Sequence, residues 1–156
     1  AAGAPKPRRA STPAVMAGGG LTVVQRPLEQ VNLMPGTPGL TATDPRRSTM
    51  AVLNAVLGAG MSSRLFQEIR EKRGLAYSVY SYASGYADAG LMGMAAACAP
   101  RKTLEVAGLM LAELERLADG ATDDELRRAK GQLAGGSALA LEDTDTRMSR
   151  LGRAEL

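Results

Sequence analysis

One stretch in the middle of the chain, where the hydrophobic period becomes two, constrains the fold more than any other feature. From 75 to 83, β-forming side chains recur at every second position, and we expect Tyr77 and Val79 on the same face of a strand. A turn at 85–89 separates this run from a Met- and Ala-rich return at 90–98. Two such runs joined by a short turn predict an antiparallel hairpin.

Helical spacing of apolar side chains precedes and follows this hairpin. Five segments have it: 44–57, 63–73, 103–118, a helix that opens at Thr122 and one that begins near 143–145. We expect Asp44 to cap the first helix and Pro45 to occupy its first position. Ser62 or Ser63 is expected to cap the second helix, and Gly74 to end it.

Two of the helices have faces that predict their packing. In 103–118, one apolar stripe consists of Leu104, Ala107, Leu111 and Leu114. The helix from Thr122 opens with the Thr-x-x-Glu spacing of a capping box, completed by Glu125. It also contains Gly131, Gly135 and Gly136, which weaken a helix. A helix or strand packed closely on that glycine face would explain them.

The remaining strands are expected before the first helix. Short β-type runs lie at 21–24 and 30–34, and Pro35 opens a Pro-Gly turn series that extends to Gly39. Because proline cannot donate a ladder hydrogen bond, the second strand ends at Pro35 or lies on an edge. The predicted order is β, β, α, α, β, β, α, α, α. This order indicates an α+β fold, a mainly antiparallel sheet with helices packed on one face.

The chain of 156 residues has the length of about one domain. We expect 1–20 to be a disordered linker or arm, because this segment is rich in Pro, Gly and Ala, and 21–156 to be the folded domain, cut from a longer protein at both ends. The net charge of +3 comes from Lys6, Arg8 and Arg9, which is too little to predict a nucleic-acid partner. The longest apolar run is too short to span a membrane, so no membrane partner is expected either.

The composition excludes several kinds of catalytic site from the chain. It has no histidine, so it cannot form a Ser-His-Asp triad, a Cys-His pair or an HxxEH zinc helix. Cys98 is the only cysteine, which excludes an internal disulfide and multi-Cys metal sites. A reducing compartment, the cytoplasm, is the simplest environment for such a chain.

An arginine and a tyrosine are the strongest candidates for chemistry. Arg70 lies in the last turn of the helix 63–73, and Tyr77 follows seven positions later, past Gly74. A guanidinium and a phenol brought together across this turn could bind the carbonyl groups of an extended peptide or a developing oxyanion. A helix C-terminus attracts cations without any function, and this is the simpler interpretation of Lys72 and Arg73.

A longer run that contains these residues is similar to a known family. Residues 57–80 have the sequence LGAGMSSRLFQEIREKRGLAYSVY. This run closely resembles the signature of the C-terminal half of insulinase/pitrilysin-type zinc metallopeptidases, on the branch similar to mitochondrial processing peptidase. Supporting similarities lie at 36–40, 44–47, 88–90, 125–130 and 141–144, so that the resemblance covers about 25–156.

The resemblance implies how the chain would work. In this family two α+β halves enclose a chamber; the N-terminal half binds zinc through an HxxEH motif, and the C-terminal half contacts the substrate. This chain would then bind no zinc and would be inactive alone. The zinc would lie in the absent N-terminal half, joined in cis or supplied by a homologous subunit, and the substrate would be a peptide.

The resemblance also assigns roles to individual residues. Tyr77 would donate a hydrogen bond to the oxyanion of the substrate, and Arg70 would hold the peptide backbone, with Arg73 as the competing arginine. A glycine-rich substrate loop would comprise Gly58, Ala59, Gly60, Met61 and Ser62.

Three positions depart from the family pattern. Asn32 replaces a usual histidine, Ala59 a third loop glycine, and Pro35 an ordinary strand residue. Asn32 cannot titrate, so a proton-transferring role is lost at that position. These departures leave open an alternative, a catalytically silent partner or scaffold subunit of a peptidase-like heterodimer.

Overall fold

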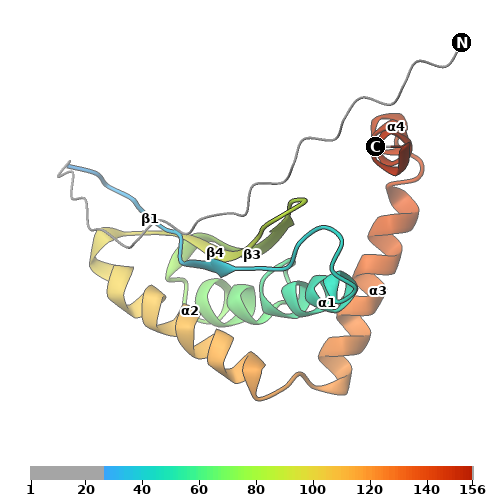
Figure 1. Cartoon of the computed structure of the whole chain (residues 1–156). Coiled ribbons are helices and arrows are strands. Elements are labelled where there is room, and N and C mark those ends of the chain that lie inside the picture. The colour runs from blue at the N-terminus through green and yellow to red at the C-terminus, as the bar shows by residue number, and fades with distance from the viewer. Residues whose placement is uncertain (1–26, 156) are drawn as a thin grey trace, which may run out of the picture.

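An antiparallel sheet is the centre of the fold, and the computed structural model places helices against one of its faces (Figure 1). The structure describes residues 27–155. Strand β4 (Gly90–Cys98) is central and pairs with β3 (Ala76–Gly85) on one side. On its other side it pairs with two short strands, β1 (Val31–Leu33) and β2 (Gly36–Pro38). The predicted α+β class with a mainly antiparallel sheet is confirmed.

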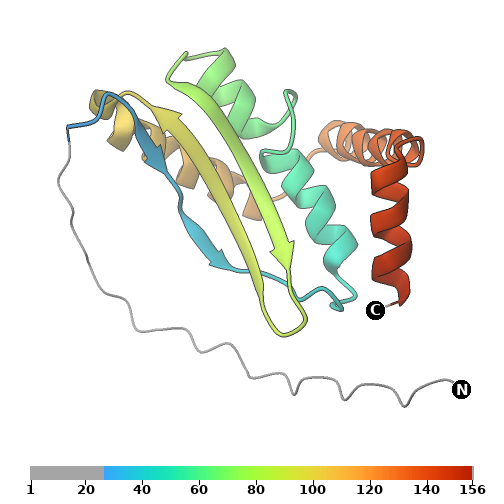
Figure 2. The same ribbon diagram turned by 90° about the horizontal axis from the view of Figure 1, so that it is seen from above.

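The core lies between the sheet and three helical elements: α1 (Arg47–Leu57), the π-helix η1 (Phe66–Glu71) and α2 (Thr103–Ala118). Its fully buried side chains are Leu57, Leu65, Ile69, Val106, Met110 and Cys98. No helix of the described residues covers the opposite face of the sheet, which faces the viewer in Figure 2. Burial of one face is the pattern expected of an antiparallel sheet.

The hairpin of β3 and β4 agrees with the sequence except near its start. Ala76 pairs with Cys98 and Ser78 pairs with Ala97, so that the register shifts by one residue at Tyr77. Val79 is buried, whereas Tyr77 is exposed. The expectation that these two side chains share a face is therefore wrong, because a β-bulge inserts an extra residue and breaks the alternation.

The edge next to β4 contains one predicted strand and one that was not predicted. β1 lies within the expected run 30–34 and ends before Pro35. The interpretation of the next residues as turns is wrong, because they form β2, and the Met94 amide donates to the Pro35 carbonyl at 3.0 Å. An edge position tolerates proline because its outer side needs no ladder donor. The predicted strand 21–24 and the arm 1–20 lie outside the described residues.

The helix starts differ from the predicted caps. α1 begins at Arg47, and its N-cap residue, Arg46, makes no side-chain cap. Asp44 instead accepts a hydrogen bond from the Arg46 amide at 2.8 Å and pairs with the Arg46 guanidinium, forming a turn before the helix. Ser63 occupies the position before the second helix, where its carbonyl accepts from the Gln67 amide at 3.0 Å, but its hydroxyl donates to the Gly60 carbonyl at 2.5 Å instead of capping the helix.

In the second predicted helix, most of the chain is wound as a π-helix. The Lys72 amide donates to the Gln67 carbonyl, five residues earlier, at 3.0 Å. Gly74 ends the element as predicted, with a φ of 59° in the left-handed region that suits glycine. Hydrophobic periodicity did not distinguish a π-helix from an α-helix over so few residues.

α2 has the predicted bounds but a different buried face. Its buried side chains are Val106, Met110, Glu113 and Leu117, whereas Leu104 and Leu111 of the predicted stripe are exposed. Glu113 made this face hard to recognise, because a carboxylate is rarely buried. Its ion pair with Arg116 provides the partner that a buried charge requires. The short 3₁₀ turn η2 (Pro100–Lys102) precedes the helix.

Two further helices extend along one end of these layers. α3 (Asp123–Leu139) begins at the predicted capping box, and α4 (Thr144–Glu155) lies at its far end (Figures 1 and 2). A Cβ atom at Gly131, Gly135 or Gly136 would meet no atom within 4 Å, so the close packing expected on these glycines is absent from the described residues. None of the helices in 27–155 is long and apolar enough to cross a membrane.

Candidate functional site

Tyr77 lies at the β-bulge, where the chain leaves η1 and enters β3. Its side chain is 67% exposed, whereas the neighbouring Leu75 and Ala76 are buried. The two buried residues anchor the strand, and the extra residue of the bulge turns the phenol outward. Bulges commonly re-aim a side chain in this way beside active sites. The phenol is therefore available to a ligand, as an oxyanion donor requires.

Arg70 and Arg73, the two candidate arginines, have different surroundings. Arg70 lies over the ring of Phe66, with its guanidinium carbon 5.0 Å from the ring centroid. Arg73 donates from two nitrogens to Glu68, at 2.5 Å and 3.1 Å, and Lys72 contacts the same carboxylate at 3.0 Å. The hydrogen bond from Arg73 is the main cause that lowers the pKa of Glu68, and the hydrogen bond from Lys72 is the second cause. Arg70 has no ion-pair partner within residues 27–155.

The candidate substrate loop, residues 58–62, is fixed at its first residues. The amides of Gly58 and Ala59 both donate to the Asn54 carbonyl at 3.0 Å. A Cβ atom on Gly58 would lie 2.4 Å from the Ser81 nitrogen, so glycine is required where the loop crosses β3. The Gly58 carbonyl in turn accepts from the Ser81 amide at 3.3 Å. The loop therefore starts in a single, closely packed conformation.

Two glutamines hold the rest of the loop, and its tip is open. Gln132 of α3 donates to the Ala59 carbonyl, and Gln67 of η1 donates to the Met61 carbonyl at 2.8 Å. Met61 is 75% exposed, and Ser62 is exposed as well. The loop thus presents its tip to a ligand while its backbone stays in place, an arrangement that reduces the entropy lost on binding.

An ion pair that the sequence did not predict connects the segment 57–80 to α3. Arg64 donates to both carboxylate oxygens of Glu125, at 2.7 Å and 2.8 Å, and to the Gly120 carbonyl at 2.9 Å. Glu125 also accepts from the Thr122 amide in the capping box. The hydrogen bond from Arg64 is the main cause that lowers the pKa of Glu125 to about 2. The sequence signals for this carboxylate were the capping-box spacing and the family similarity at 125–130, and neither indicated Arg64 as its partner.

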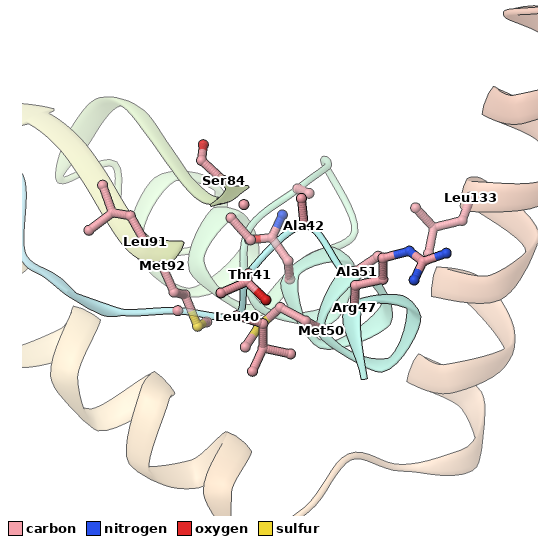
Figure 3. A pocket seen from close by; sticks show the side chains of 15 residues that line it. Leu40, Thr41, Ala42, Arg47, Met50, Ala51, Ser84, Leu91, Met92 and Leu133 are labelled. Atoms are coloured by element: carbon pink, nitrogen blue, oxygen red, sulfur yellow. The ribbon is translucent and has the colours of Figure 1, made fainter. Parts of the chain in front are cut away.

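A cavity of about 290 Å³ lies between α1, α3 and the turn end of the β3–β4 hairpin (Figure 3). Its lining is mostly apolar, and its polar members are Thr41, Arg47, Asn54 and Ser84. Ala59 is the only residue of the loop 58–62 among its lining residues, and neither Arg70 nor Tyr77 is one of them. The cavity therefore touches the candidate substrate loop only at Ala59 and is separate from Arg70 and Tyr77.

The chain's own residues offer no place for a metal ion where the structure describes them. That part of the chain contains no group of three or more His, Cys, Asp or Glu side chains arranged so that they could hold a metal ion. Arg70 and Tyr77 share no hydrogen bond in the described structure and come from neighbouring elements, η1 and β3. Asn32 lies on the edge strand β1, exposed and paired in register with Ala97 of β4.

Known proteins resemble this chain in sequence over most of its length. It is 53% identical over 149 residues to an uncharacterized zinc protease of Streptomyces coelicolor, covering 95% of this chain and 32% of that protein. It is 46% identical over 131 residues to the uncharacterized zinc protease YmxG of Bacillus subtilis, covering 82% and 32%. The chain thus spans about a third of the length of the curated relatives that it matches.

Solved structures share its fold. A crystal structure of a peptidase M16 inactive domain from Pseudomonas fluorescens matches with a TM-score of 0.68 and 33% identity, over 72% of this chain and 28% of that one. A protease from Helicobacter pylori matches with a TM-score of 0.70, over 78% of this chain and 30% of that one, at 21% identity. The second likeness shows the fold alone.

A family model provides the decisive comparison. The model described as the peptidase M16 inactive domain matches residues 2–133, which is most of the chain. This match agrees with the resemblance of the segment 57–80 to insulinase-type peptidases, but it does not distinguish a branch within them. The chain belongs to the peptidase M16 (insulinase) family, as part of its inactive C-terminal domain.

Proposed function

We propose that this chain is the peptide-binding part of a zinc metalloendopeptidase whose metal site lies in another domain. Tyr77 carries the proposal, because its phenol is exposed at a bulge directly after the buried residues Leu75 and Ala76, and a peptide can reach it. In this proposal the phenol donates to the oxygen of the scissile carbonyl as negative charge develops there. Such donors act through fixed geometry and need no proton transfer.

Arg70 is the second residue of the proposed site. Its guanidinium rests on an aromatic ring and has no carboxylate partner among the described residues, so its donors can bind peptide carbonyls. Arg73 competes poorly, because Glu68 accepts from two of its nitrogens. The exposed tip of the loop 58–62, Met61 and Ser62, provides further substrate contacts.

The described residues do not fit a zinc ion, so the proposal derives no step from zinc in this chain. A metal-binding domain, in cis or in a homologous subunit, is proposed to supply it, as in the branch similar to mitochondrial processing peptidase. Metal analysis of the isolated chain after dialysis should find no stoichiometric zinc. The proposal places the protein in a reducing compartment, the cytoplasm, where the buried free thiol of Cys98 persists.

The experiment that tests this function uses the full-length protein with a quenched fluorescent peptide. We expect zinc-dependent cleavage that a chelator abolishes and added zinc restores. Arg70→Ala should raise KM about 10–100-fold, the loss expected for charge-assisted hydrogen bonds, while Arg73→Ala as the matched control changes KM less than about threefold. Absence of cleavage and of an HxxEH motif in the full-length protein would instead support the silent scaffold subunit.

A further inference from the structure

We infer that Phe66 and Glu68 are positioning residues that select Arg70 as the peptide-binding cation of η1. This inference rests on the proposed function and deepens it, because it explains how one of three neighbouring cations is chosen. Arg70, Lys72 and Arg73 all lie within one turn of chain. A cation already paired with a carboxylate offers fewer donors and less charge to a peptide carbonyl than one held without a carboxylate.

Phe66 holds Arg70 without using any of its hydrogen-bond donors. The guanidinium carbon lies 5.0 Å from the ring centroid, within the range of a cation–π contact. Because a phenyl ring has no oxygen or nitrogen acceptor, this contact does not pair the N–H donors of Arg70 with a carboxylate or a carbonyl group. Phe66 thereby reduces the number of side-chain conformations of Arg70 while all of its donors stay available to a substrate.

Glu68 occupies hydrogen-bond donors of the other two cations, Lys72 and Arg73. It accepts hydrogen bonds from Lys72 at 3.0 Å and from Arg73 at 2.5 Å and 3.1 Å. The exposed fraction of the Glu68 side chain is only 16%, so these partners shield it and it does not extend toward Arg70. The carboxylate thus offsets part of the charge of Lys72 and Arg73 and occupies donors of both that an incoming peptide would otherwise meet.

The π-helical winding makes this division possible. Residues five apart in an α-helix point ~140° away from each other, so Glu68 would not reach Arg73 from regular helical positions. In η1 the hydrogen bond from the Lys72 amide to the Gln67 carbonyl spans five residues. Arg73 directly follows this wide last turn and meets Glu68, while Arg70 lies beside Phe66.

The experiment measures peptide binding and cleavage by the full-length protein with three variants. Binding of a fluorescein-labelled unstructured peptide to the zinc-stripped protein is followed by anisotropy, and cleavage is measured with zinc. We expect Phe66→Leu to weaken binding and to raise KM about 3–30-fold with kcat nearly unchanged. Phe66→Tyr, which retains the ring, should bind as the unmodified protein does. Tyr86→Leu is the matched control, an exposed aromatic residue outside the site, and should change neither quantity.

Double variants separate positioning from packing. In an Arg70→Ala background, Phe66→Leu should have no further effect, because its partner is already absent. Glu68→Gln should reduce the binding loss that Arg70→Ala causes by at least about threefold, since Arg73 is then released to replace Arg70. The inference would be overturned if Phe66→Leu weakened binding equally with and without Arg70. It would also be overturned if Arg70→Ala weakened binding as much in the Glu68→Gln background as in the unmodified protein.

The outcomes also distinguish this inference from the proposed function. A full-length protein that binds the peptide but does not cleave it contradicts the peptidase function, while the binding cycle still decides the roles of Phe66 and Glu68. Cleavage with unchanged KM in Phe66→Leu contradicts the inference and leaves the peptidase function intact. Absence of peptide binding in the unmodified protein overturns both.

Discussion

Two regions of this chain are built in contrasting ways. The corner formed by the loop 58–62, η1 and the start of β3 is held by contacts that come from α1, α3 and β3. The second half of α3 and α4 form a C-terminal arm, distinct from the segment 1–20. This arm makes few such contacts. Its glycines face open space, and three of its large apolar side chains, Leu139, Met148 and Leu151, are more than 60% exposed.

The contrast separates two uses of glycine. Gly58 lies where a Cβ atom would collide with the backbone of β3, so glycine is needed there for a close approach. A Cβ atom on Gly135 of α3 would meet no atom within 4 Å. Among the described residues, this glycine therefore only lowers the stability of α3. Rigid positioning at the corner and a weakly packed arm predict different responses to the same kind of change.

The largest effect should come from the corner's exposed phenol. Tyr77→Phe should lower kcat of the full-length protein about 10²–10³-fold, because it removes one oxyanion donor and little else. Steady-state kinetics on a quenched peptide measures this, with Tyr86→Phe as the matched control. A change of less than about threefold at Tyr77 would mean that the bulge does not serve chemistry.

The next largest effect concerns the loop's first glycine. Gly58→Ala should destabilise the protein by about 1–3 kcal/mol, since the new Cβ atom must displace the Ser81 backbone. Urea denaturation followed by circular dichroism measures the change. Unchanged stability would show that the corner adapts to the added methyl group and is less rigid than described.

A smaller effect should follow from the ion pair between the corner and α3. Glu125→Gln should cost about 1 kcal/mol at neutral pH. Because the folded protein lowers the pKa of Glu125 from 4.5 to about 2, its contribution is complete above pH 4.5 and is lost as the pH falls toward 2. The stability difference between the two proteins should therefore shrink over this range. Glu142→Gln, at an exposed position outside the ion pairs of the described residues, is the matched control and should change the stability at neutral pH by less than about 0.5 kcal/mol.

The smallest effect should come from the arm and have the opposite sign. Gly135→Ala should stabilise the protein by about 0.5–1 kcal/mol through helix propensity alone. Thermal unfolding of this variant beside Gly58→Ala compares the two regions directly. Destabilisation by Gly135→Ala in the full-length protein would reveal a close neighbour that another part of that protein supplies.

The sequence predicted the parts of the fold that depend on local patterns. Period-two alternation located the hairpin, and the Thr122–Glu125 spacing located the start of α3. It did not predict β2, because proline and glycine usually indicate turns and the pairing with β4 depends on residues far along the chain. The sequence did not predict the bulge either, because an alternating pattern assumes that every residue of a strand is paired, and Tyr77 is an extra residue.

The sequence predicted which residues belong to the candidate site but not the contacts that surround them. Arg70 and Tyr77 were recognised from their spacing around Gly74 and from the family resemblance. Their surroundings were not, because the π-helical turn that pairs Glu68 with Arg73 has no distinct hydrophobic period. The ion pair of Arg64 with Glu125 joins residues 61 positions apart, a separation over which no local pattern operates.

The central claim is that the rigid corner, and not the arm, binds the peptide. Hydrogen–deuterium exchange of the full-length, zinc-free protein with and without an unstructured peptide tests it most directly. We expect the peptide to slow exchange of amides in 58–62 and 70–78 and to leave 139–152 unchanged. Slowed exchange confined to 139–152, with the corner unaffected, would contradict the claim.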